Sequence, residues 1–148
     1  MKYDLHDSLG YKLTYAARLN ERRFERALAE IGLTRLIWCV LCALSYQGLS
    51  RPSEIAEYIG VDRTAISRAL TRMDKAAMIS RASDPDGDGR ARMIVITETG
   101  ATALSSATVA AKENAAFWAD KLTGGDRIAL RRALDELIEN ADEPLQGL

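Results

Sequence analysis

The chain has 148 residues, of which 47% are apolar and 28% charged, with 20 Lys and Arg against 21 Asp and Glu. This composition is ordinary for a folded domain and argues against a disordered chain. The net charge of −1 excludes a protein that grips polyanions by bulk charge, so a nucleic-acid function would need a local patch. We find no signal peptide and no run of about 18 apolar residues, and we therefore expect no membrane span and a cytoplasmic location.

Helical spacing of apolar residues predicts a first helix over residues 5–31, which Gly32 would end. Thr34 is placed to cap a second helix through RLIWCVLCALSY. Because that segment is apolar nearly all round, we expect it to be buried. Gly48 would end it.

A third helix is predicted within SRPSEIAEYIG, where Ser50 and Arg51 are both open as the capping residue. Gly60 would break this helix. Asp62 is placed to cap a fourth helix that runs to about Met78.

The periodicity then changes. Residues 79–83 and 92–96 predict two short strands around the Pro/Gly/Asp-rich hairpin tip DPDGDGRA. Thr97 would begin a long Ala-rich helix, and Thr123 with Asp126 resembles a capping box for the last helix. The apolar positions of that last helix have the 4-3-4 spacing of a helix–helix seam: Leu130, Leu134, Leu137 and Ala141.

Cys39 and Cys42 form a C-x-x-C pair on the second helix. A zinc site would need two more ligands, which the lone histidine, His6, cannot complete. An EF-hand interpretation of the hairpin tip lacks the later Glu and the flanking helices. We therefore expect no metal and no cofactor. Packing near the core and thiol-based redox sensing both remain open for the cysteines.

The fourth predicted helix divides into an apolar face and a basic face. The basic face carries three arginines, one lysine and three hydroxyl residues with a single acid: Arg63, Thr64, Ser67, Arg68, Thr71, Arg72, Asp74 and Lys75. A merely solvated face usually intersperses both signs of charge. Arginine can bond guanine through two parallel hydrogen bonds, and Ser or Thr can serve bases or phosphates. The pattern favours a helix that reads duplex DNA.

The preceding residues predict a helix-turn-helix, because a short helix ends at Gly60, turns through Val61 and Asp62, and leads into the basic helix. At the tip of the following hairpin, Arg90 could lie along the DNA backbone or enter the minor groove, with Asp88 orienting it. One copy would bind weakly, so we expect a symmetric dimer with two such helices about one DNA turn apart.

The sequence resembles the MarR family of bacterial transcription regulators in three stretches. These are SEIAEYIGVDRTAISRAL, DGR ahead of a hydrophobic strand, and ITETG at the opening of the next helix. The resemblance covers roughly residues 24–140. It implies a mostly α winged helix-turn-helix fold of four helices, a hairpin wing and two more helices. Residues 33–97 would form the DNA-binding lobe, and residues 1–32 and 98–148 a helical dimerisation region. The hairpin tip and the LSRPSE segment each carry an extra residue relative to the family.

The family resemblance also implies site residues. Thr64, Ser67 and Arg68 would approach bases, while Arg63 and Arg72 would reach bases or phosphates. The whole set of DNA-binding candidates is Ser53, Arg63, Thr64, Ser67, Arg68, Thr71, Arg72 and Arg90, with Asp88 supporting the wing. For an effector, aromatic walls and a cation could come from His6, Tyr11, Tyr15, Arg18 and Trp38, although packing or surface roles also explain each of them.

The expected function is a homodimeric, ligand-responsive regulator of double-stranded DNA, and the resemblance favours a repressor. It would leave a pseudo-palindromic operator when a small aromatic acid or phenol binds. Two alternatives stay open: a redox-sensing regulator through Cys39 and Cys42, and a winged-helix module that binds another protein. An enzyme is not expected, because no Ser–His or Cys–His arrangement and no phosphate-cradling glycine loop occurs.

Overall fold

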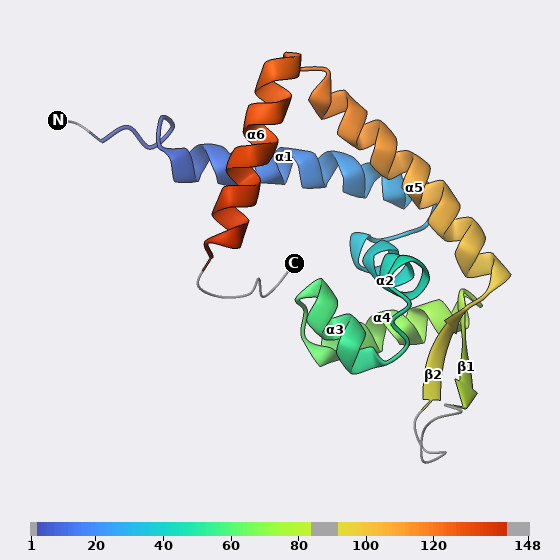
Figure 1. Ribbon diagram of the computed structural model, residues 1–148. Coiled ribbons are helices and arrows are strands. Elements are labelled where there is room, and N and C mark those ends of the chain that lie inside the picture. The colour runs from blue at the N-terminus through green and yellow to red at the C-terminus, as the bar shows by residue number, and fades with distance from the viewer. Residues whose placement is uncertain (1–2, 84–91, 142–148) are drawn as a thin grey trace.

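Six helices and one two-stranded antiparallel sheet make up the computed structural model, which describes residues 3–83 and 92–141, with Arg92 described in its backbone alone (Figure 1). The elements follow in the order α1 (Leu9–Glu30), α2 (Arg35–Tyr46), α3 (Pro52–Ile59), α4 (Arg63–Lys75), β1 (Ile79–Ser83), β2 (Arg92–Ile96), α5 (Glu98–Ala119) and α6 (Gly124–Glu139). This order is the predicted winged helix-turn-helix arrangement.

Side-chain caps fix the starts of most helices. Thr34 Oγ1 accepts the Ile37 N–H at 3.3 Å and Asp62 Oδ1 accepts the Ala65 N–H at 2.7 Å, so both predicted caps are confirmed. At α6, Thr123 Oγ1 accepts the Asp126 N–H at 3.2 Å, as predicted. Each such bond satisfies a backbone donor that the helix itself cannot satisfy.

Of Ser50 and Arg51, the two residues that could cap α3, Arg51 occupies the N-cap position. Its backbone N–H donates to a carboxylate oxygen of Glu54 at 3.4 Å, and the two side chains form an ion pair at 3.5 Å. Pro52 occupies the first turn, where a missing N–H costs nothing.

Two predicted helix boundaries are wrong. The first helix starts at Leu9, because the hydroxyl oxygen of Ser8 accepts the Tyr11 N–H at 3.4 Å and caps it there. The fourth helix ends at Lys75 and does not reach Met78. The chain leaves the helix at Ala77, whose φ is +54°, and the Met78 N–H returns to the Met73 carbonyl oxygen at 2.9 Å. A left-handed residue closed by such a bond is a common C-terminal stop, although glycine usually supplies it.

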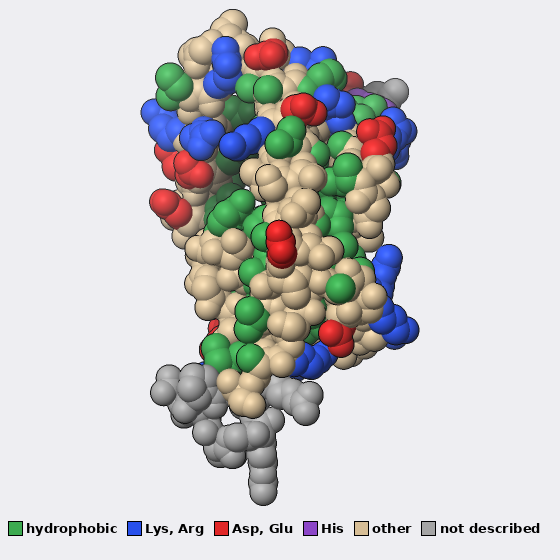
Figure 2. Space-filling model, turned by 90° about the vertical axis from the view of Figure 1, so that its right-hand side faces the viewer, with side chains coloured by type: hydrophobic (Ala, Val, Ile, Leu, Met, Phe, Trp, Pro, Cys, Tyr) green, Lys and Arg blue, Asp and Glu red, His purple; other side chains and the backbone are tan. Residues whose placement is uncertain are grey.

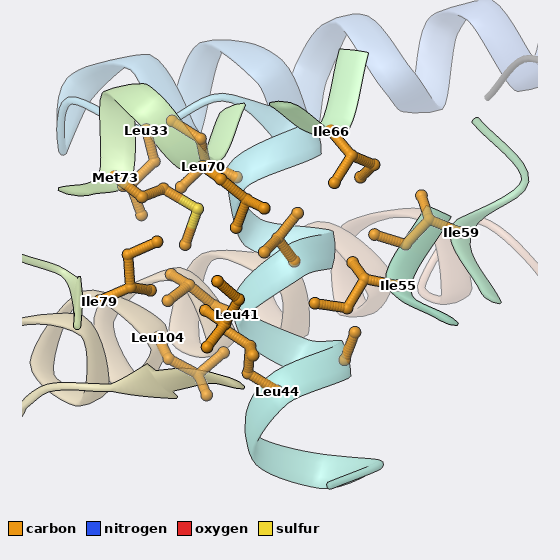
Figure 3. Packing of buried hydrophobic residues seen from close by; sticks show 14 of the residues in the cluster. Leu33, Leu41, Leu44, Ile55, Ile59, Ile66, Leu70, Met73, Ile79 and Leu104 are labelled. Atoms are coloured by element: carbon orange, nitrogen blue, oxygen red, sulfur yellow. The ribbon is translucent and has the colours of Figure 1, made fainter. Parts of the chain in front are cut away.

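The core lies where α2, α3, α4, the sheet, the end of α1 and the start of α5 meet (Figure 3). Its largest fully buried side chains are Leu28, Leu41, Ile55, Ile66, Met73 and Val40. Burying one such side chain contributes about 1.5–3 kcal/mol, so this cluster supplies most of the driving force for folding of the lobe. The predicted burial of α2 is confirmed for one side of the helix. On its other side, Leu36, Trp38, Cys39 and Cys42 are partly buried at the edge of the core, and Tyr46 is exposed.

The two strands attach to the lobe by backbone bonds and side chains. β1 and β2 pair antiparallel with Ile79 opposite Ile96, and Ile79 and Ile94 are buried in the core. The Ile94 N–H also donates to the Ser50 carbonyl oxygen at 2.8 Å, which ties the strand to the loop ahead of α3. The hairpin base therefore has a fixed position relative to α3.

Beyond the lobe, α1 and α5 pack against each other, while α6 has no buried side chain. In the part of the chain that the structure describes, no single helix is long and apolar enough to cross a membrane. The bent pair α1 and α2, at 81° to each other, passes that test together by length and composition.

Candidate nucleic-acid interface

The orientation of α4 is fixed by its apolar side. Ile66, Ala69, Leu70 and Met73 are buried against the lobe. Because these four residues recur at helical spacing, the opposite side of α4 must face outward. The predicted packing face is confirmed within α4 itself, while Ala76 and Ala77, which continue the apolar pattern past its end at Lys75, are exposed.

The basic face of α4 is open to solvent. Its exposed members are Arg63, Thr64, Ser67, Arg68, Thr71, Arg72, Asp74 and Lys75. Within the described residues neither its three arginines nor Lys75 form an ion pair, so the four cations are free to meet an anion. Thr71 differs from its neighbours because its hydroxyl donates to the Ser67 carbonyl oxygen at 2.9 Å and retains only acceptor capacity.

The turn before α4 sets the angle at which this face is presented. Gly60 has φ of +76°, a left-handed conformation that glycine adopts without the cost of a Cβ. The N–H groups of Gly60 and Val61 both donate to the Ala56 carbonyl oxygen, at 3.0 and 3.1 Å. The turn is therefore closed by backbone bonds, and α3 lies against α4.

A shallow hollow of about 340 Å³ adjoins the basic face. It brings together residues from three elements: Pro52 and Ser53 of α3, Arg63, Ser67 and Leu70 of α4, and Arg81 of β1. Three of the predicted DNA-binding residues thus share one surface. Two arginines and two hydroxyl groups around a hollow match the donors that bind a phosphate of a nucleic-acid backbone.

Arg81 is a residue that the sequence reasoning missed. It lies on β1 opposite Ile94 and is exposed. Side chains alternate along the strand ISRAS, so the inward Ile79 indicates that residues 80 and 82 point to the other side and that Arg81 shares the side of Ile79. The alternation does not indicate that Arg81 borders α3 and α4. The predicted wing residues Asp88 and Arg90 lie outside the described residues.

The predicted effector residues fall into two separate places. His6 lies edge-on to Tyr11 with ring centroids 4.6 Å apart, and Tyr11 stacks on Tyr15 at 5.8 Å. Tyr11, Tyr15 and Arg18 border a hollow of about 540 Å³ at the start of α1.

Trp38 is not part of that group. It packs edge-on against Phe24, with ring centroids 4.9 Å apart. Phe24 lies nine residues after Tyr15, which corresponds to about 13 Å along a helix. Trp38 therefore belongs with the packing of α1 on α2, and four of the five predicted effector residues remain together.

The two thiols are partly buried at the edge of the core. Burial raises the pKa of Cys39, although the charge of Arg35 opposes the shift. Burial, with a smaller contribution from Cys39, raises the pKa of Cys42 to about 11. Thiolate is the reactive form, so both environments work against a reactive cysteine. Within residues 3–83 and 92–141, no three His, Cys, Asp or Glu side chains gather as metal ligands would.

Comparison with known proteins agrees with this arrangement. A family model described as MarR family matches residues 31–91, which span α2, α3, α4 and β1. The HTH-type transcriptional repressor NicR from Pseudomonas putida is 26% identical over 138 residues, which cover 93% of this chain and 87% of NicR.

Two solved structures share the whole arrangement of elements. BpsR from Bordetella bronchiseptica, studied for the regulation of its DNA binding by 6-hydroxynicotinic acid, gives a TM-score of 0.81 at 20% identity, covering 96% of this chain and 100% of BpsR. A mutant MarR from E. coli complexed with operator DNA gives 0.78 at 20% identity, covering 92% and 99%. At this identity the likeness shows a common fold.

Proposed function

We propose that the chain is a transcription regulator of the MarR family, whose model matches residues 31–91, and that it binds operator DNA as a homodimer and leaves it when a small aromatic acid or phenol binds. The observation that carries the proposal is the basic face of α4, exposed and free of ion pairs within the described residues while the opposite face is packed. Four cations on one side of a helix repel one another weakly unless an anion is near, and duplex DNA supplies that anion.

On duplex DNA, α4 would enter the major groove, with Thr64, Ser67 and Arg68 toward base edges. Arg63 and Arg72 would reach bases or phosphates, and Thr71 would act as an acceptor. Ser53 and Arg81 would bind the backbone from the hollow beside α4. Arg90, with Asp88 orienting it, would meet the minor groove. A MarR mutant of the same fold was solved in complex with operator DNA, which supports duplex DNA as the ligand.

The proposed dimer joins residues 1–32 and 98–148 of two chains, leaving residues 33–97 as the DNA-binding lobe. Support comes from α6, where Ile128 and Ile138 are 73% and 71% exposed along with Leu130, Leu134 and Leu137. A row of large apolar side chains left in water is unfavourable, and a second copy would cover it. Two lobes would then present two α4 helices to a pseudo-palindromic site.

For the effector, we propose the group of His6, Tyr11, Tyr15 and Arg18 at the start of α1, with Trp38 left to packing. Stacked aromatic rings offer flat apolar walls, and Arg18 offers a partner for a carboxylate. That BpsR is regulated by 6-hydroxynicotinic acid makes this compound the first probe to try. NicR is a repressor, which supports repression as the direction of control.

The proposal is tested by fluorescence anisotropy with the DNA upstream of the gene and with random DNA of equal length, at two salt concentrations. We expect selective binding that weakens steeply with salt, and release by 6-hydroxynicotinate, benzoate or a phenol in the wild type. Arg18→Ala should retain DNA binding but lose release by the carboxylates. Equal affinity for both DNAs would refute the proposal that the protein recognises an operator sequence.

The alternatives have less support. Raised pKa values at Cys39 and Cys42 work against a thiol sensor. A protein-binding module would show no selective DNA binding, so the same titration separates it from a DNA-binding regulator. We propose no catalytic role, since the family and the relatives found are regulators of transcription.

A further inference from the structure

The exposed side of α4 has a centre and two flanks. Four buried residues fix the direction of the core: Ile66, Ala69, Leu70 and Met73. Since each residue of a helix advances by about 100°, four exposed positions form a central row opposite the core: Thr64, Arg68, Thr71 and Lys75. Arg63 borders the hollow with Pro52 and Arg81, and so it lies on the flank nearest α3 and β1. In a major groove the central row would lie closest to the base edges.

Arg68 lies in the middle of this central row, one helical turn after Thr64. Its guanidinium forms no ion pair with any residue that the structure describes. An arginine in this position can make two parallel hydrogen bonds to O6 and N7 of guanine. Lys75 shares the row, but it is the last residue of α4, and a recognition helix contacts bases mainly through its N-terminal part. Arg68 is therefore the cation of the row that lies nearest to base edges.

The other side chains of α4 distinguish the bases less well. The Thr71 hydroxyl donates to the Ser67 carbonyl oxygen at 2.9 Å, so it has no donor left for the acceptors of guanine. The Thr64 hydroxyl can donate or accept, and such a group suits any base. Helix α4 contains no Asn or Gln, the side chains that pair with adenine, and its one acid, Asp74, follows the buried Leu70 by a turn and lies beside the packed side. A paired contact of Arg68 with guanine is thus the most selective contact available at the centre of α4.

Positive charge on the rest of the molecule is divided. On the face that Figure 2 shows, Lys and Arg side chains lie in two groups toward its upper and lower ends, and the middle is mostly uncharged. The whole chain has a net charge of −1. Attraction of the whole surface to phosphates is therefore weak, and selectivity for one DNA sequence has to come from contacts with bases.

We propose that Arg68 reads a guanine in each half-site of the operator, through O6 and N7, and that the selectivity of α4 depends mainly on this base. The inference rests on the proposed function as a dimeric operator-binding protein. An A·T pair in the same place keeps the N7 acceptor but replaces O6 with an amino group, so a guanidinium donor would face another donor. Because a two-fold axis repeats each contact, the two guanines lie on opposite strands.

The test uses the full-length chain, fluorescence anisotropy and a duplex that the wild type selects from a random pool. Each guanine is replaced in turn by 7-deazaguanine, which exchanges the N7 acceptor for a C–H group and keeps the base pair. We expect one guanine in each half-site at which this replacement weakens wild-type binding about fivefold or more. A G·C to A·T exchange at that pair should weaken binding about fivefold to a hundredfold.

Two variants assign the effect to a residue. Arg68→Ala should bind the unmodified duplex more weakly and should no longer respond to 7-deazaguanine, because the group that senses N7 is gone. Arg81→Ala is the matched control, since it removes another exposed arginine, one proposed to bind a phosphate; it should lower affinity and keep the full response. Circular dichroism should show both variants folded, because neither side chain is buried.

The failure of this inference differs from the failure of the proposed function. A response to 7-deazaguanine that is equal in the wild type and Arg68→Ala would overturn the inference and leave the proposed function standing. A selected duplex in which no guanine responds would do the same. A wild type that binds selected and random duplexes equally would overturn both.

Discussion

Thr97 ties the start of α5 to the segment that follows α4. Its hydroxyl donates to the Ala77 carbonyl oxygen at 2.6 Å, and its backbone N–H donates to the Met78 carbonyl oxygen at 3.0 Å. The same hydroxyl oxygen accepts the Gly100 N–H at 3.1 Å and so caps α5. One residue thus joins the end of the basic helix to the helix proposed for dimerisation, and the two must move together.

Gly100→Ala should disrupt this joint. A Cβ at residue 100 would lie 2.1 Å from the Met78 carbonyl oxygen and 2.8 Å from Ile96 Cγ1, and backbone cannot yield as a side chain can. We expect a loss of about 2 kcal/mol or more in the free energy of unfolding, measured by urea denaturation. Gly125→Ala is the control, because nothing lies within 4 Å of its Cβ and alanine favours a helix. Equal stability of the two variants would contradict the close approach.

Ala77→Gly should stabilise the protein. The left-handed φ of +54° is unfavourable for a residue with a Cβ, and Ala77 is exposed, so no packing is lost. Allowing for the larger entropy of unfolded glycine, we expect a gain of about 0.5–1 kcal/mol in the free energy of unfolding. Ala76→Gly tests the reasoning, since its φ of −86° needs no glycine and the change should destabilise. A loss at both positions would argue against strain at Ala77.

Arg81→Ala and Arg68→Ala should weaken DNA binding in different ways. Arg81 borders the hollow with Ser53 and Arg63, where a backbone phosphate would bind. Its loss should lower affinity for all DNA sequences. It should also reduce the slope of log affinity against log salt concentration by about 1 per phosphate contact. Arg68 is proposed to face the bases, so its loss should cost about 1–3 kcal/mol per base contact and relax selectivity. Arg22→Ala on α1 should leave both quantities unchanged.

The thiols should react slowly below pH 9. With a pKa of about 11, Cys42 holds about a hundredfold less thiolate at pH 8 than a thiol of pKa 9.0. Its alkylation by iodoacetamide should be correspondingly slow and should accelerate up to about pH 11. The Cys39→Ser, Cys42→Ser double variant should respond to oxidants as the wild type does; release of DNA by peroxide from the wild type alone would establish a thiol sensor.

The same pKa shift links the thiol to stability. The folded chain holds the Cys42 proton more tightly than the unfolded chain, so the thiol contributes stability that is fully present below about pH 9. That contribution is lost as the pH rises toward 11, because the unfolded thiol ionises first. The denaturation midpoint should fall between pH 8 and pH 10.5, and this fall should be smaller in Cys42→Ser than in the wild type.

Local signals in the sequence were enough for most of the fold. Thr34, Asp62 and Thr123 cap the helices predicted for them, because a cap depends on a side chain and a backbone N–H three residues away. The end of α4 was missed because a non-glycine residue, Ala77, takes the left-handed position. Nothing in the residue types around it marks the stop.

The candidate site was predictable on one element and less so across several. The basic face of α4 follows from helical spacing alone. Arg81 joins that surface through strand pairing and the contact of the lobe with β1, which no short stretch of sequence encodes. For the same reason Trp38 could not be separated from Tyr11 and Tyr15 before the packing of Trp38 on Phe24 was known. The sequence identifies the candidate residues, and tertiary contacts decide which of them lie together.

The lack of any buried side chain on α6 has a consequence for the living cell. If a second copy supplies that burial, occupancy of an operator scales with the square of the number of chains at low abundance. Halving gene dosage would then lower occupancy up to fourfold, and newly made single chains, with apolar helices uncovered, would be the form that proteases remove first.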